Sequence, residues 1–237
     1  TSYKSGLAGD KFILDDLGVE YLGDSDYCPD YFRVLSPIDK EIEPAEYVMY
    51  ERGTKVQPGD GAQILAETYQ PYFNRTWEHF SSHAQTPPDK KTPYPAAVRN
   101  GNVIYISYPI FRAYILNGNL VYKKLVRNCI DLLLDNPLTV DNAPSTARIT
   151  VTSQHYNGKD RYIVHILHYI PERRCKSIDV IEDVIPIYNI NLKVRVDGSP
   201  SRCYLVPEKK EVNFVYNNGY VEFTVPEVNG YQMVVIE

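Results

Sequence analysis

The sequence predicts an α/β plus all-β protein, in which an incomplete α/β domain of the doubly wound type is followed by an antiparallel β-sandwich. Three observations support this order. Helical and extended patterns are mixed before residue 135, strand-length segments separated by turn residues follow residue 146, and the segment between them is rich in proline, asparagine and aspartate. We therefore expect one domain over residues 1–140 and a second over residues 141–237.

The first part is expected to contain two helices and several short strands. The clearer helix is amphipathic, with apolar residues three and four positions apart. It follows a hairpin that the dipeptide Asn100-Gly101 predicts. The expected helices cover residues 11–17 and 120–134, and the expected strands cover 19–22, 47–50, 63–68, 95–98 and 103–108. Because two helices are few for a doubly wound domain, its front is expected to be missing, and a complete small α+β domain is the alternative.

The second part shows the spacing of an antiparallel sandwich. Short apolar segments alternate with glycine-containing turns such as Asp197-Gly198 and Asn229-Gly230. The segment 161–169 is apolar on both faces, so we expect a central strand that is covered on both sides. The expected strands are 147–155, 161–169, 187–196, 202–206, 212–216, 220–225 and 232–236.

Composition excludes several functional classes. The net charge is -5 and the basic residues are scattered, so we expect no nucleic-acid partner. No apolar run approaches the roughly 18 residues of a membrane helix, so we expect no membrane partner. The 21 tyrosines and 17 prolines favour a β-rich, loop-rich protein, which is typical of secreted carbohydrate-handling modules.

We expect no metal site and no cofactor. His165 and His168 are three positions apart on one predicted strand and therefore point to opposite faces, so they cannot bind one metal ion. The cysteines form no CxxC pair, and pairing between the last two is left open. The four cysteines are Cys28, Cys129, Cys175 and Cys203.

The candidate binding residues lie in one segment, residues 71–83, bounded by Pro71 and Pro87-Pro88. Aromatic rings beside charged side chains recognise sugars, because rings stack on C–H faces while charged groups bind hydroxyls. A buried aromatic loop that seals an interface is the alternative. A further alternative is that the chain is an independent small enzyme that uses Glu78, His79 and His83. The expected substrate-binding residues are Arg75, Trp77, Glu78, His79 and His83.

No catalytic residue is predicted. Glycosidic cleavage requires two carboxyl groups roughly 5 to 10 Å apart, one of them protonated. Acidic residues are present, but none lies at a strand end in a recognisable catalytic context, and the sequence has no GxSxG, HExxH, P-loop or GxGxxG motif.

Several segments together resemble parts of one enzyme family. The segments 5–19, 101–106 and 109–111, with the helix that follows, resemble the flavodoxin-like, amidotransferase-like trimerisation domain of beta-galactosidase-type glycoside hydrolases. The segments 165–174, 180–186 and 226–233 resemble the C-terminal β-sandwich of such hydrolases, including alpha-L-fucosidase-type chains.

The resemblance implies an accessory role. In this family the catalytic carboxylates belong to a (β/α)8 barrel, which this sequence does not contain, and the amidotransferase-like domain serves assembly. It implies a non-catalytic region for oligomerisation and architecture, with residues 71–83 lining the sugar cleft of the barrel. Its partners would be the catalytic barrel of the parent chain, further copies in a homo-oligomer and a carbohydrate ligand, in a periplasmic or extracellular location. The alternative is a carbohydrate-binding module with an aromatic platform of Tyr188, Tyr204, Tyr216 and Tyr220.

Overall fold

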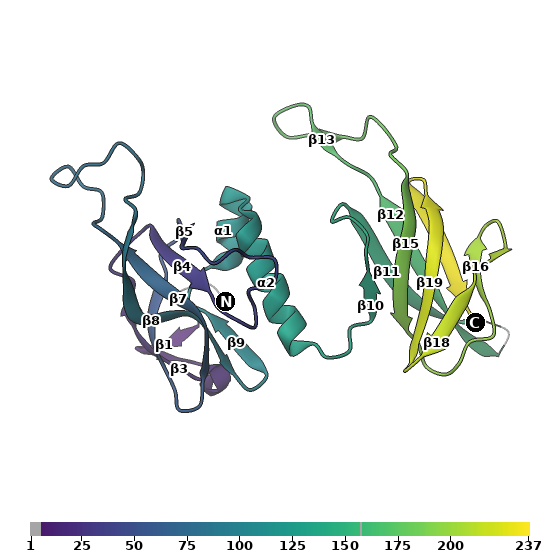
Figure 1. The fold of residues 1–237 in the computed structure, drawn as a ribbon, viewed down its shortest axis with the longest axis horizontal. Helices are drawn as coiled ribbons and strands as arrows, with labels where there is room; N and C mark the ends of the chain where they lie inside the picture. The colour runs from purple at the N-terminus through teal and green to yellow at the C-terminus, as the bar shows by residue number, and fades with distance from the viewer. Residues whose placement is uncertain (1–5, 157) are drawn as a thin grey trace. The chain divides into compact units, whose positions relative to one another are not determined.

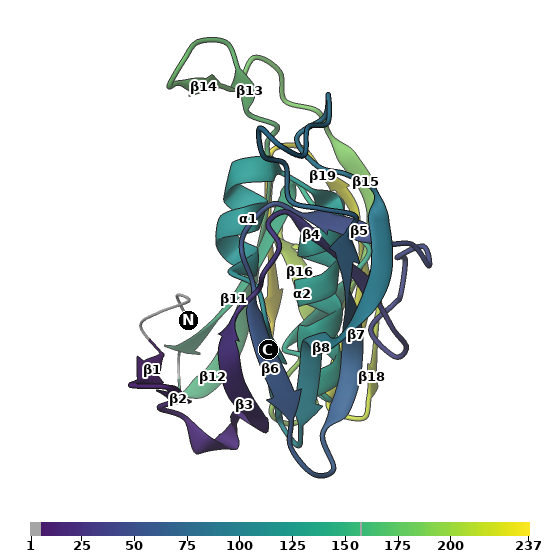
Figure 2. The ribbon, with the colours of Figure 1, turned by 90° about the vertical axis from the view of Figure 1, so that its left-hand side faces the viewer.

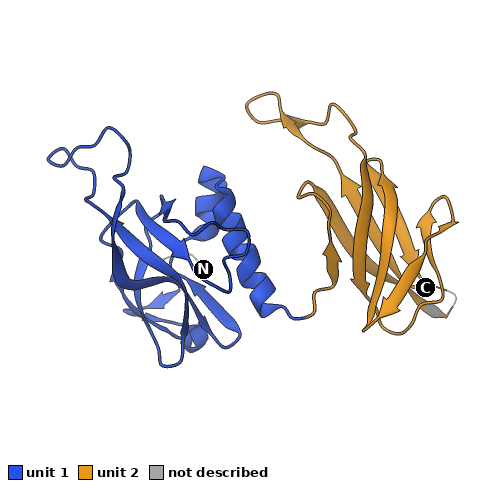
Figure 3. Ribbon diagram, in the orientation of Figure 1, with its two compact units in different colours: residues 1–135 blue, residues 136–237 orange. Residues whose placement is uncertain are grey.

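The computed structural model describes residues 6–156 and 158–237. The chain divides into two compact units, residues 1–135 and residues 136–237, which Figure 3 shows in different colours. The division falls inside the turn-rich segment between the two expected domains. Each unit has its own cluster of buried apolar side chains.

The largest sheet of the first unit has five antiparallel strands in the order β5-β4-β7-β8-β9 (Figure 1). Its longest hairpin, β7–β8, contains register shifts of the kind that β-bulges produce. Two-stranded sheets β3-β6 and β1-β2 belong to the same unit. The strand bounds are β1 Leu7–Ala8, β2 Lys11–Phe12, β3 Val19–Asp24, β4 Asp30–Val34, β5 Tyr47–Met49, β6 Thr54–Pro58, β7 Gln63–Pro71, β8 Pro88–Asn100 and β9 Val103–Ile106.

Two helices pack against the five-stranded sheet, α1 (Ile110–Asn117) and α2 (Leu120–Leu133) (Figures 1 and 2). Gly118 ends α1 in the left-handed conformation at φ 61°, which glycine adopts without strain. The side chain of Asn119 then caps α2 by accepting a hydrogen bond from the backbone N–H of Val121 at 3.0 Å. A glycine stop followed by an asparagine cap explains why the chain forms two helices here.

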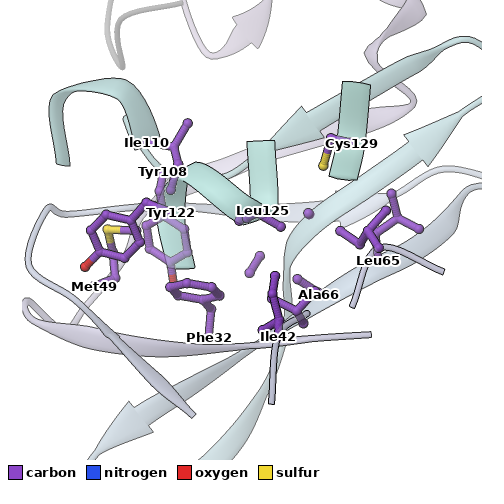
Figure 4. Packing of buried hydrophobic residues seen from close by; sticks show 14 of the residues in the cluster. Phe32, Ile42, Met49, Leu65, Ala66, Tyr108, Ile110, Tyr122, Leu125 and Cys129 are labelled. Carbon is purple, nitrogen blue, oxygen red and sulfur yellow. The ribbon is translucent and has the colours of Figure 1, made fainter. Parts of the chain in front are cut away.

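The core of the first unit lies between α2 and the sheet (Figure 4). Tyr122 and Leu125 of α2 are 0% and 2% exposed. The ring of Tyr122 lies 6.0 Å from the ring of Phe32, and its hydroxyl donates a hydrogen bond to the carbonyl of Val48 at 2.6 Å. Each fully buried large apolar side chain stabilises the fold by about 1.5–3 kcal/mol. The burial of Tyr122 and Leu125 therefore holds α2 against the sheet.

The structure does not show the expected flavodoxin-like or amidotransferase-like portion. Every strand pair in the described part of the unit is antiparallel, whereas a doubly wound domain has parallel strands joined by crossover helices. A hairpin followed by an amphipathic helix fits both arrangements, so periodicity could not separate them. The unit therefore has the α+β organisation. The expected helix over 11–17 is replaced by β2 and a 3-10 helix, Asp15–Leu17.

The second unit contains two larger antiparallel sheets, in the orders β10-β15-β19-β18 and β11-β12-β20-β16-β17, and a short β13-β14 pair. Buried side chains from both larger sheets form one core, so the expected sandwich and all seven of its expected strands are confirmed. The bounds are β10 Thr139–Asp141, β11 Ala147–Tyr156, β12 Lys159–His168, β13 Glu172–Arg173, β14 Asp179–Val180, β15 Ile187–Arg195, β16 Cys203–Val206, β17 Lys210–Glu211, β18 Phe214–Asn217, β19 Tyr220–Val228 and β20 Tyr231–Ile236.

Strand β12 is internal to its sheet, as expected, but it is not fully covered on both faces. Val164 and Ile166 are 0% exposed, whereas Leu167 on the other face is 40% exposed. His168 is buried, and its ring nitrogens lie 3.0 Å from the Thr146 hydroxyl and 3.0 Å from the Ile185 carbonyl. This histidine is thus a hydrogen-bonded core residue.

Neither helix of the described chain is both long and apolar enough to cross a bilayer. All four cysteines are free: Cys175 is exposed and Cys203 is buried, which resolves the pairing left open by the sequence.

Candidate functional site

The candidate binding residues lie on the connection between β7 and β8, residues 72–87, which we call the Trp77 loop. Pro71 ends β7 and Pro88 begins β8, so the prolines that bound the segment in the sequence bound the loop in the structure. Figure 1 shows this loop projecting beyond the ends of the two strands.

The Trp77 loop exposes large aromatic side chains. Trp77 is 88% exposed, Phe80 68% and Tyr72 61%. Exposed aromatic surface gathered on one projecting loop marks a contact surface for a ligand or another protein surface. The alternative of a buried aromatic loop is not seen within this unit.

The base of the loop is fixed to the sheet by two polar side chains. Asn74 accepts a hydrogen bond from the backbone N–H of Cys28 at 3.1 Å and donates one to the carbonyl of Asp26 at 2.8 Å. At the other end of the loop, the hydroxyl of Tyr31 donates to the carbonyl of Thr86, and both residues are buried. The loop therefore starts and ends at fixed points.

The tip of the loop is organised by a reciprocal pair of hydrogen bonds. The backbone N–H of Thr76 donates to the carbonyl of His79 at 2.9 Å, and the backbone N–H of His79 donates to the Thr76 hydroxyl at 3.0 Å. This closes a turn that carries Trp77 and Glu78 at its outer side. The rings of His79 and Phe73 lie 5.7 Å apart.

All five predicted site residues lie in this loop and are exposed. The turn brings Trp77, Glu78 and His79 together, and the guanidinium of Arg75 lies 5.1 Å from the centre of the Phe80 ring. His83 lies further along, where its carbonyl accepts a hydrogen bond from the Ser81 hydroxyl at 2.9 Å. Within residues 6–156 and 158–237, no group of three or more metal-ligand side chains occurs.

A small polar cavity of about 80 Å³ lies next to the segment that anchors the loop, lined in part by Asp26, Asp30 and Tyr108. Asp30 is 1% exposed, and Ser25 donates a hydrogen bond to its Oδ2 at 3.0 Å. Its Oδ1 and the hydroxyl of Tyr108 are buried and make no hydrogen bond of standard geometry in the described part of the chain. Burial raises the pKa of Asp30 to about 7, although the Tyr108 hydroxyl is close enough to lower this pKa in part.

The sequence did not single out Asp30 from the other acids of the first unit. Its signal is weak: an aspartate directly before the apolar residues Tyr31 and Phe32, at the start of a strand. Only the structure shows that its carboxyl points into the unit and lies beside Tyr108 at a cavity.

An apolar face on α1 is a second exposed surface of the first unit. Ile115 is 81% exposed, Phe111 67% and Leu116 60%. Phe111 and Ile115 are four positions apart and point away from Ile110 and Ala113, the residues of α1 that enter the core, while Leu116 lies at the edge of the exposed face. Clustered exposure of this kind on one helix is typical of a surface that another protein surface covers.

The four tyrosines of the expected aromatic platform come from both sheets of the second unit. Tyr188 and Tyr216 are 58% and 37% exposed, on β15 and β18. Tyr204 belongs to β16, in the other sheet, and lies under the guanidinium of Arg202. Tyr220 donates from its hydroxyl to the carbonyl of Pro137 at 2.7 Å. The four rings therefore do not form a single platform.

The chain is similar to a solved glycoside hydrolase structure. It aligns with alpha-L-fucosidase isoenzyme 2 from Paenibacillus thiaminolyticus at a TM-score of 0.89 and 32% sequence identity, over 98% of this chain and 35% of that one. The chain thus spans about a third of the length of that enzyme. Because the alignment covers nearly all residues of this chain, it includes both units.

The chain also aligns with a second solved structure, a Paenibacillus sp. cycloisomaltooligosaccharide glucanotransferase complexed with cycloisomaltoheptaose. The TM-score is 0.24 and the identity 19%, over 47% of this chain and 20% of that one, which is too low to indicate a shared fold. No protein-family model and no curated protein sequence matches the chain. The fold of this chain is therefore a fold found within an alpha-L-fucosidase.

Proposed function

We propose that this chain is a non-catalytic accessory region of an alpha-L-fucosidase-like glycoside hydrolase. The observation that carries the proposal is the 0.89 TM-score at 32% identity, which extends over nearly the whole chain but only about a third of the enzyme. The remaining two thirds of such an enzyme leave room for a catalytic barrel. In this proposal the barrel supplies the reacting carboxylates, and the present chain supplies structure around it.

The Trp77 loop is the part of the chain that reaches the sugar. A nearly fully exposed indole beside Arg75, Glu78 and His79 provides a ring face for C–H groups and charged groups for hydroxyls. Its anchors at Asn74 and Thr86 keep the loop in place before any ligand arrives. The loop would line the cleft of the barrel, on the same polypeptide or on a neighbouring subunit.

Assembly is the second part of the proposed role. The apolar face formed by Phe111, Ile115 and Leu116 would lose much of its exposure in contact with the rest of the enzyme or with another copy. Removing apolar surface from water stabilises an assembly by roughly 25 cal/mol per Å² before the entropic cost of association.

A non-catalytic role agrees with the carboxyl groups of the site. A retaining or inverting mechanism needs two carboxyl groups across a sugar, with one of them protonated. Glu78 is exposed at the loop, and Asp30, whose burial raises its pKa to about 7, faces a cavity of about 80 Å³, which is too small for a sugar ring.

The test is an assay of this chain with aryl alpha-L-fucosides and aryl beta-galactosides. We expect no turnover above that of a matched sample of the Glu78→Gln variant. Turnover that Glu78→Gln or Asp30→Asn abolishes, in a variant that remains folded by circular dichroism, would overturn the non-catalytic assignment.

A further inference from the structure

The second unit has a groove that the proposed function does not use. It has a volume of about 810 Å³ and is lined mainly by the four-stranded sheet β10-β15-β19-β18, with Leu205, Lys210 and Glu211 contributed by β16 and β17 of the other sheet. Volumes of this size are typical of ligand sites. The side chains that line it include Asn191, Lys193, Glu222 and Thr224, which alternate along β15 and β19 with buried core residues.

The strand register arranges these side chains in two rows. In one row Lys193 lies opposite Glu222, with Val140 and Val215 as the outer neighbours on β10 and β18. The lysine and glutamate form an ion pair at 2.8 Å, and the two valines are 45% and 64% exposed. This row therefore offers an apolar contact at each end and a neutralised ion pair in the middle.

The other row is made of neutral polar groups. Asn191 lies opposite Thr224, whose hydroxyl donates to Asn191 Oδ1 at 2.8 Å. Asn142 fixes the strand by accepting a hydrogen bond from the backbone N–H of Asn191 at 2.8 Å. In the described part of the chain, no hydrogen bond uses Asn191 Nδ2 or the side chain of Asn213, which also lines the groove. These amides remain available to a ligand.

This chemistry fits a neutral sugar chain. Amides both donate and accept hydrogen bonds, as sugar hydroxyls do, and the valines can contact sugar C–H groups. The strands lie about 4.8 Å apart, so four strands provide a row of contacts roughly 14 Å long, more than one sugar unit covers. The groove lining contains no tryptophan, tyrosine or arginine, the residues that dominate protein–protein contacts.

We propose that this groove binds a neutral, unbranched oligosaccharide, weakly at each unit and more tightly as the chain grows longer. Two phenylalanines line the groove, but Phe223 is a core residue that is 5% exposed and Phe214 packs against the same core. A single sugar therefore has little ring surface to stack on, so several hydrogen-bonding positions must act together. The site differs from the expected tyrosine platform in both position and chemistry. It would hold the protein on a polymeric or oligomeric substrate, independently of the Trp77 loop.

The test is a titration of the 237-residue chain, followed by NMR, with mono-, tri- and hexasaccharides of galactose, xylose and glucose. We expect shifts confined to the groove strands for at least one series and a dissociation constant that falls with chain length. Asn191→Ala and Thr224→Ala should each weaken hexasaccharide binding about fivefold.

Thr150→Ala is the matched control, because Thr150 is an exposed strand threonine of the other sheet. It should leave binding unchanged. Three results would overturn the proposal: no shift in the groove at the highest sugar concentration, equal losses in Thr150→Ala and Thr224→Ala, or groove shifts that appear only when another protein is added.

Discussion

The side chain of Asn74 accepts a hydrogen bond from the backbone N–H of Cys28 at 3.1 Å, although the two residues are 46 positions apart in the sequence. This bond ties the start of the Trp77 loop to the segment before β4. The same side chain also donates to the carbonyl of Asp26. The side chain of Asn74 therefore fixes the start of the loop to the segment that contains Asp26 and Cys28.

Replacing Asn74 by alanine is expected to loosen the loop while leaving the fold intact. Loss of two partly exposed hydrogen bonds should lower the free energy of unfolding by about 1–2 kcal/mol. Amide hydrogen exchange should accelerate more in residues 72–87 than in α2, whose amides should change only by the loss of global stability. Ser82→Ala, an exposed change in the same loop, is the control. Equal exchange in Asn74→Ala and Ser82→Ala would contradict the anchoring role.

Asp30 should make the stability of the chain depend on pH. Its pKa is raised from 3.8 to about 7 in the folded state, so the folded protein binds the proton more tightly than the unfolded chain. The contribution of Asp30 is therefore complete below about pH 4 and is lost as the pH rises to 7, by up to about 4 kcal/mol. Unfolding in urea at a series of pH values measures this slope.

Asp30→Asn should remove that slope, because an amide does not titrate over this range. Asp60→Asn, at an exposed turn, should leave the slope as it is in the unchanged protein. A pH dependence that persists unaltered in Asp30→Asn would show that another group is responsible.

The contact between α2 and the sheet should dominate the stability of the first unit. Leu125 is 2% exposed, so Leu125→Ala is expected to lower the free energy of unfolding by about 2–5 kcal/mol through lost burial and a cavity. Leu120 is on the same helix but 56% exposed, and Leu120→Ala should cost less than about 1 kcal/mol. Similar losses for the two variants, measured in denaturant, would mean that the helix is not packed as described.

The exposed face of α1 should matter for assembly more than for folding. Ile115→Glu places a charge where an assembled state would bury an apolar side chain, and it should shift a protein that contains this chain toward smaller species in analytical ultracentrifugation. Lys123→Glu, which makes an exposed position of α2 acidic, should leave the sedimentation profile unchanged. An unaltered profile in Ile115→Glu would remove this face from the assembly surface.

The sequence predicted the second unit well because its signals are local. Each expected strand is bounded by turn residues such as Asp197-Gly198, and alternation along β15 and β19 assigns the buried faces. The coverage of β12 was overestimated because an apolar residue such as Leu167 need not be buried.

The first unit was harder to predict because strand direction is not a local property. The helix over 120–134 is present as α2, but α1 was missed because its eight residues are too few to show a period. The Asn100-Gly101 turn predicts the β8–β9 hairpin, but whether other strands such as β4 and β7 pair parallel or antiparallel depends on contacts between distant segments. The Trp77 loop was identifiable from Pro71 and Pro87-Pro88, whereas the exposure of Trp77 was not.

In the proposed function, the Trp77 loop completes the sugar cleft of a catalytic barrel. The most direct measurement is kcat/KM for an aryl alpha-L-fucoside in an enzyme that joins this chain to its barrel, with Trp77→Ala compared with Tyr72→Ala, a change of another exposed aromatic residue of the loop. Trp77→Ala should lower kcat/KM about tenfold or more, since a stacked ring contributes about 1.5–3 kcal/mol, and Tyr72→Ala should change it less than about twofold. Unchanged kcat/KM in Trp77→Ala, with the protein folded and assembled as before, would contradict the account.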